Sequence, residues 1–130
     1  MVKLTKEDEE LISKAKSLVN PIKHSEQFES GSVGCALITD KGNIFMGVCL
    51  DLSCAIGGCA EHTTISQMIT NNETKIKTIV ACSKSKIMYP CGKCREMIQL
   101  INKNNREDTE VITSDKGKVK LKEILPGEWY

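Results

Sequence analysis

The chain has 130 residues, of which 40% are hydrophobic, and this size and composition predict a single soluble domain spanning residues 1–130. Its 18 Lys and Arg residues nearly balance 17 Asp and Glu residues, and the formal charge of +1 provides no strong field to attract nucleic acid or an anionic membrane. No apolar run reaches the ~20 residues that cross a bilayer, and no apolar signal core follows the N-terminus. We therefore expect a cytoplasmic protein that binds neither membranes nor nucleic acid.

The first segment of the chain predicts an amphipathic helix. Thr5 is a plausible N-cap, although Asp8 stands where Glu or Gln would complete a capping box. Apolar residues then recur at helical spacing through about Val19, and Pro21 ends the helix. The polar segment 21–32 that follows is expected to be a loop.

A β-hairpin and a second helix come next. Residues 33–39 and 44–50 are rich in β-formers, and residues 40–43, Asp-Lys-Gly-Asn, favour a tight turn between them. After a Gly-Gly pair, the stretch from Cys59 to Thr70 carries apolar residues at helical spacing. A helix is therefore predicted to begin at or near Cys59.

The second half of the chain continues the alternation of strands and helices. Residues 76–82 predict a buried strand, residues 83–86 a loop and residues 91–101 a helix. Short strands are expected at residues 110–113 and 119–121. The predicted order is α-β-β-α-β-α-β-β with about five strands, a pattern that supports a layered α/β fold.

The candidate functional residues lie at the starts of the two later helices. Cys59 and Glu61 open one helix, and Cys91 and Cys94 open the other about thirty residues later. Because Cys91 and Cys94 are three residues apart, a helix places both sulfur atoms on one face, and Cys59 becomes a third ligand if the helix N-termini converge. The seven cysteines, an odd number without a secretion signal, argue for metal binding or reduced core thiols over a disulfide framework.

Three thiolates leave a tetrahedral zinc ion one open position for water, as in a catalytic site. Glu61 is close enough to Cys59 in sequence to contact that water without binding the metal. Three thiolates and Zn²⁺ sum to a charge of −1, which the partial positive charge of two helix N-termini offsets in part. Arg95, next to Cys94, is expected to donate hydrogen bonds to a ligand sulfur and keep the zinc electrophilic.

Other interpretations of these residues remain open at this point. Cys91 and Cys94 also fit a structural zinc knuckle or a redox pair, and Cys54 could complete a closed four-cysteine site. Glu61 could be a first-turn acid that only interacts with the helix dipole. We favour the catalytic site because the whole motif, with Glu61 two residues after Cys59, is more specific than either part.

The chain resembles the cytidine deaminase superfamily in its two metal motifs, Cys59-Ala60-Glu61 and Pro90-Cys91-Gly92-Lys93-Cys94. The resemblance covers most of the chain, including the segment 32–37, the hairpin after it and Cys94-Arg95-Glu96. The first motif has a cysteine in place of histidine, and in this respect the chain resembles the branch of the family that acts on free nucleosides.

This resemblance implies a fold, a cofactor and an assembly. The fold is a three-layer α/β/α sandwich with a mixed five-stranded sheet. One Zn²⁺ per chain would be held by Cys59, Cys91 and Cys94. Short members of the family are usually homotetramers, so we expect a homotetramer.

The resemblance also implies a reaction, the hydrolytic deamination of a cytosine-type nucleoside to its uracil form with release of ammonia. Glu61 would move protons from the zinc-activated water to N3 of the pyrimidine and to the leaving amino group. The backbone N–H of Ala60 would help to hold the pyrimidine carbonyl, and the backbone at Pro90 would contact the exocyclic amine.

Several positions depart from the family pattern, among them two that bind the sugar in typical members. Cys49 and Asp51 align with the Asn and Glu that bind ribose hydroxyls in typical members, so they are candidate substrate contacts with altered chemistry. The Gly57-Gly58 pair and residues 123–130 are similar to blasticidin-S deaminases, which act on a cytosine nucleoside antibiotic. The expected substrate is thus cytidine, deoxycytidine or an analogue such as blasticidin S. The alternative is a non-catalytic, zinc-stabilised binding module on the same fold.

Overall fold

The computed structural model describes all 130 residues. Its helices are α1 (Lys6–Ser17), α2 (Ala60–Thr70), α3 (Gly92–Ile101) and the short α4 (Asn105–Asp108). Its strands are β1 (Ile22–Ser25), β2 (Phe28–Thr39), β3 (Ile44–Leu52), β4 (Ile76–Ser83), β5 (Ile87–Met88), β6 (Glu110–Ser114) and β7 (Gly117–Lys120). A single 3-10 turn, η1 (Leu121–Glu123), leads into the C-terminal tail. None of the helices has the length and apolar character needed to span a membrane.

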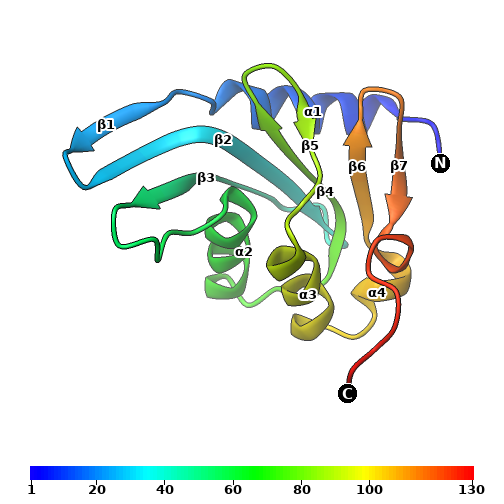
Figure 1. Cartoon of the computed structure of the whole chain (residues 1–130). Helices are drawn as coiled ribbons and strands as arrows, with labels where there is room; N and C mark the ends of the chain where they lie inside the picture. The colour runs from blue at the N-terminus through cyan, green and yellow to red at the C-terminus, as the bar shows by residue number, and fades with distance from the viewer.

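All seven strands belong to one mixed sheet. Its path is β1-β2-β4-β6-β7, with β3 also paired to β2 and β5 to β4. The pairing of β4 with β6 is parallel, whereas the other pairings are antiparallel. Helix α1 covers one face of the sheet, and α2 and α3 cover the other (Figure 1). The arrangement is the predicted three-layer α/β/α sandwich, with seven strands in place of five.

The two additional strands are edge strands that the sequence pattern does not mark. The expected loop at residues 21–32 is wrong: most of it forms β1 and the start of β2, paired at positions such as Ile22 and Ser30. All four residues of β1 are exposed, so no apolar alternation identifies it. Strand β5 has only two residues and pairs Met88 with Ala81. Both strands depend on main-chain pairing with a longer neighbour.

Helix α1 begins where the sequence predicts, and Asp8 does complete the capping box. Its carboxylate accepts a hydrogen bond from the Thr5 N–H at 2.8 Å, while the Thr5 hydroxyl accepts one from the Asp8 N–H at 3.2 Å. Asp8 also pairs at 2.8 Å with Lys118 of β7, which lies 3.0 Å from Glu110. Burial alone would raise the pKa of Asp8, but the hydrogen bond from Lys118 acts in the opposite direction, and the pKa is lowered. This buried ion pair fixes α1 to the far edge of the sheet.

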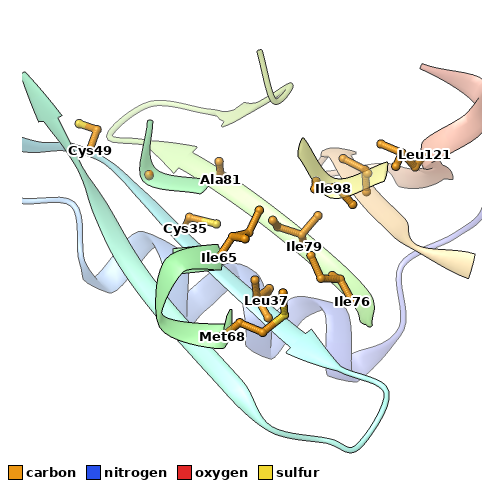
Figure 2. Close-up of a cluster of buried hydrophobic side chains, with 12 residues drawn as sticks. Cys35, Leu37, Cys49, Ile65, Met68, Ile76, Ile79, Ala81, Ile98 and Leu121 are labelled. Atoms are coloured by element: carbon orange, nitrogen blue, oxygen red, sulfur yellow. The ribbon is translucent and has the colours of Figure 1, made fainter. Parts of the chain in front are cut away.

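Apolar side chains fill both faces of the sheet. Along β2, Cys35 and Leu37 belong to the cluster under α2 and α3, whereas Ala36 and Ile38 belong to the cluster under α1. This alternation is the period of two that a pleated strand imposes. Figure 2 shows the first cluster, in which Ile65 of α2 packs over β2 and β4. The packing holds α2 and α3 on one face, with their N-terminal ends available for a shared site.

Candidate active site

Three thiols meet at the N-termini of α2 and α3. Cys59 is the N-cap residue of α2, Cys91 is the N-cap residue of α3, and Cys94 lies in the first turn of α3. Their sulfur atoms all lie within 4.8 Å of one another, and the Sγ atoms of Cys59 and Cys91 are 3.5 Å apart. Sulfur atoms at ~2.3 Å from one tetrahedral zinc ion lie about 3.8 Å from each other, so the cluster fits that ion.

Cys54 is not part of this cluster. It is exposed, in the loop after β3, whereas the other cysteines outside the cluster, Cys35, Cys49 and Cys82, are buried. The site therefore offers three thiols and not the four of a closed structural site. A tetrahedral ion held there retains one position for water.

The electrostatics of the three thiols favour a bound cation. Burial, followed by the negative charge of Glu61, raises the pKa of Cys94 well above its usual value. Burial and the hydrogen bond with Cys91 also raise the pKa of Cys59. Burial opposes ionisation of Cys91 as well, but hydrogen bonds from the backbone of Cys94 and from Cys59 lower its pKa. Three thiolates are therefore stable here only with a compensating charge, which a divalent metal and two helix N-termini supply.

Glu61 lies in the first turn of α2 and shares a cavity with two of the thiols. It is only 5% exposed and forms no ion pair. Burial raises the pKa of its carboxyl, partly offset by a hydrogen bond to its own backbone. A buried carboxylate without a cationic partner is suited to accept and return a proton.

A cavity of about 440 Å³ opens beside the thiols. Its walls come from β2, β3, the loop before α2, the start of α2 and the segment between β4 and α3. Eleven of its 16 lining residues are hydrophobic, and the size and composition are those of a small-molecule site.

Two glycines bring the walls of this cavity together. A Cβ atom on Gly57 would lie 2.1 Å from the Leu50 carbonyl oxygen, so only glycine allows the loop before α2 to fold back onto β3. Leu50 and the adjacent Gly58 exchange two backbone hydrogen bonds there. On the other side, a Cβ atom on Gly47 would lie 2.7 Å from the Thr63 hydroxyl, so α2 rests directly on β3.

The cavity brings together most of the residues expected to contact substrate. Ala60, Cys49 and Asp51 line it, whereas Pro90 is buried and does not line it, although its chain neighbours Tyr89 and Cys91 do. Three further lining residues, which the sequence did not single out as contacts, are Ser32, Met88 and Tyr89. One feature of the sequence could have marked Tyr89 as a lining residue, namely its position directly before the Pro-Cys motif.

The sequence predicts that Arg95 donates a hydrogen bond to a ligand sulfur, but in the structure its partners are different. Its Nε donates to the Pro90 carbonyl at 2.8 Å, its Nη1 donates to the Ile124 carbonyl at 3.0 Å, and its guanidinium lies 5.8 Å from the Tyr89 ring centre. Consecutive helix residues are about 100° apart around the axis, so Arg95 points away from the face that presents Cys94. Arg95 instead links the cavity wall to the C-terminal tail.

An Arg95→Gln variant is expected to lose about 1–3 kcal/mol of unfolding free energy, because two partly buried carbonyls lose a charged donor. We expect zinc to stay bound, since no sulfur depends on the guanidinium. Denaturant unfolding and metal analysis measure the two effects. Lys93→Gln, which removes an exposed charge from the same helix, is the control. Loss of zinc in Arg95→Gln alone would contradict this role and favour a contact with sulfur.

The fold and the site together define an α/β protein in which three thiols suited to a metal ion lie beside a small-molecule cavity. Residues 5–106 match the family model described as "Cytidine and deoxycytidylate deaminase zinc-binding region". The chain therefore belongs to the cytidine and deoxycytidylate deaminase family. Since the match includes Cys59, Cys91 and Cys94, zinc is the metal of the three-thiol cluster.

Known proteins share both sequence and fold with the chain. A probable cytidine deaminase from Dictyostelium discoideum is 36% identical over 67 residues, which make up 49% of this chain and 46% of that protein, so the match spans about half of each. The cytidine deaminase structure from Burkholderia pseudomallei has a TM-score of 0.75 at 22% identity, covering 97% of this chain and 100% of the other. The Mycobacterium leprae enzyme has a TM-score of 0.75 at 20% identity, covering 92% and 97%. These structures confirm the predicted fold class.

Proposed function

We propose that the chain is a zinc-dependent hydrolase that deaminates a cytosine-type nucleoside to its uracil form and releases ammonia. Cytidine, deoxycytidine and an analogue such as blasticidin S are the candidate substrates. The observation that carries the proposal is the buried, unpaired carboxylate of Glu61 in the same cavity as the thiols of Cys59 and Cys91. Membership of the family and the names of the relatives support it.

In the proposed reaction, Cys59, Cys91 and Cys94 hold the zinc ion, which when bound lowers the pKa of water and makes it a nucleophile near neutral pH. Glu61 accepts a proton from the water and delivers it to N3 of the pyrimidine. It then passes the second proton to the amino group, which leaves as ammonia while the ring gains the oxygen. Ala60 lines the cavity, and its N–H, at the first position of α2, lacks an intrahelical acceptor and is free for the pyrimidine carbonyl.

The remaining substrate contacts are proposed from positions around the cavity. The Pro90 carbonyl accepts a hydrogen bond from Arg95 and keeps a second lone pair for the exocyclic amine. Cys49 and Asp51 line the β3 wall and are proposed to face the sugar.

Incubation with a panel of cytosine nucleosides tests the proposal. Zinc-loaded protein is expected to release one ammonia per cytidine, deoxycytidine or blasticidin S consumed. Removal of zinc with a chelator should abolish this release, and added Zn²⁺ should restore it. Protein that holds one zinc per chain yet releases no ammonia from any member would contradict the proposal. It would favour the non-catalytic, zinc-stabilised binding module.

We further propose that the chain acts in the cytoplasm as a homotetramer, with a small molecule and not a membrane or nucleic acid as its ligand. Leu52 and Tyr89 line the cavity yet stay 38% and 52% exposed, and the nearby Ile56 is 80% exposed. A neighbouring subunit would bury these side chains. A solution mass equal to that of one chain would contradict this assembly.

A further inference from the structure

The three thiols of the metal site differ in their access to solvent. Cys91 is exposed and Cys59 is partly exposed, and both residues line the cavity of about 440 Å³. Cys94 is fully buried and does not line the cavity. A small oxidant that enters the cavity therefore meets the sulfur atoms of Cys59 and Cys91, whereas the sulfur atom of Cys94 is shielded from it.

The two accessible sulfur atoms are close enough to react with each other. The Sγ atoms of Cys59 and Cys91 are 3.5 Å apart, and a disulfide bond requires about 2.05 Å, so the two atoms need to approach by about 1.5 Å. Each residue is the N-cap of its helix and lies outside the first helical turn. A change in its side-chain torsion angles therefore leaves the helical hydrogen bonds in place.

A disulfide bond between Cys59 and Cys91 would remove two of the three zinc ligands. Cys94 would be the only thiol left in the cluster. The remaining cysteines of the chain lie outside the cluster and do not replace the lost ligands. Because zinc sites in proteins use three or four protein ligands, a single thiol does not retain the ion.

We propose that Cys59 and Cys91 form a redox switch through which a peroxide causes the chain to release its zinc. The Cys91 sulfur attacks one oxygen of hydrogen peroxide, the O–O bond breaks, and the other oxygen leaves and is protonated to water. The Cys59 sulfur then attacks the resulting sulfenic acid, so that an S–S bond forms and the second oxygen also leaves as water. The two thiolates lose two electrons in total, and the peroxide takes them up with two protons.

The oxidised chain is expected to bind no zinc, and a dithiol reductant should return both thiols and with them the metal site. The arrangement matches that of cysteines that sense peroxides, in which an accessible thiol lies next to a second thiol that resolves the sulfenic acid. The inference requires the zinc-binding thiols but not the proposed deamination.

The test treats zinc-loaded protein with hydrogen peroxide in the presence of a colorimetric zinc chelator. We expect each chain to lose the mass of two hydrogen atoms and to release one zinc ion, and peptide mapping should find Cys59 joined to Cys91. Dithiothreitol should reverse the change in mass, and added Zn²⁺ should then restore one zinc per chain. Cys54→Ala, which removes an exposed thiol outside the cluster, is the matched control and should behave as the wild type does.

A second measurement separates formation of the disulfide from loss of the metal. Zinc-free wild type and Cys94→Ala both keep the two reacting thiols, so peroxide should join Cys59 to Cys91 in both. A disulfide that joins Cys91 to Cys94 or to Cys54 would overturn the assignment of the pair. Full zinc occupancy after peroxide treatment, or zinc release that dithiothreitol does not reverse, would overturn the switch. None of these measurements depends on ammonia release, so a failure of the proposed reaction would be recognised separately.

Discussion

Replacing Glu61 with Gln is expected to lower kcat for cytidine deamination by about 10²- to 10⁴-fold, the range that a positioned proton donor and acceptor contributes. Gln keeps the size of the side chain but cannot accept a proton from water. Glu61 lies outside the three-thiol cluster, so one zinc per chain should remain bound. Steady-state ammonia release and metal analysis of the same preparation measure both quantities.

Glu73→Gln is the matched control for this variant. Glu73 is 7% exposed, close to the 5% of Glu61, but it lies in the loop after α2, where its carboxylate accepts a hydrogen bond from Asn43 at 2.8 Å. Losing a buried carboxylate there should leave kcat unchanged. A Glu61→Gln enzyme with a kcat within about threefold of the wild type would remove Glu61 from the proposed proton transfers.

The metal centre could be predicted because its residues occupy positions with strong local rules. Cys59 and Cys91 both stand where apolar helical spacing begins, and the structure confirms them as N-cap residues. The sequence alone does not show whether the N-termini of the two helices converge. Their convergence follows from the sheet, because β4 lies between α2 and α3 in the chain and both helices pack on the same face. Convergence is therefore a property of topology, which local spacing does not encode.

Features that depend on backbone pairing or on side-chain direction could not be predicted from the sequence. Strand β1 has no buried residue, so its existence depends on pairing with β2. The adjacency of Arg95 to Cys94 predicts a sulfur partner, yet its partners are the carbonyls of Pro90 and of Ile124, which lies 29 positions after Arg95. Tyr89 lines the cavity directly after β5, a two-residue strand that the pairing with β4 holds in place. In each case a distant segment decides the contact.

Replacing Cys94 with Ala is expected to abolish zinc binding at micromolar zinc and, with it, deamination. Cys94 is the fully buried member of the cluster, and two thiols at the more exposed Cys59 and Cys91 leave the ion short of protein ligands. A ligand present at 100 to 1,000 times its dissociation constant stabilises the folded state by about 3–4 kcal/mol. A chelator should therefore lower the unfolding free energy of the wild type by about that amount and leave Cys94→Ala unchanged.

Cys54→Ala separates this centre from a closed four-thiolate site. Cys54 is exposed and lies only five positions before Cys59, so a rearrangement of the loop between them would bring its thiol to a metal that required a fourth sulfur ligand. We expect Cys54→Ala to retain one zinc per chain, its response to chelator and its kcat. Loss of zinc from Cys54→Ala would mean that the metal has four protein ligands and no position for water. A water nucleophile at the metal would then be ruled out, and with it the reaction proposed for Glu61.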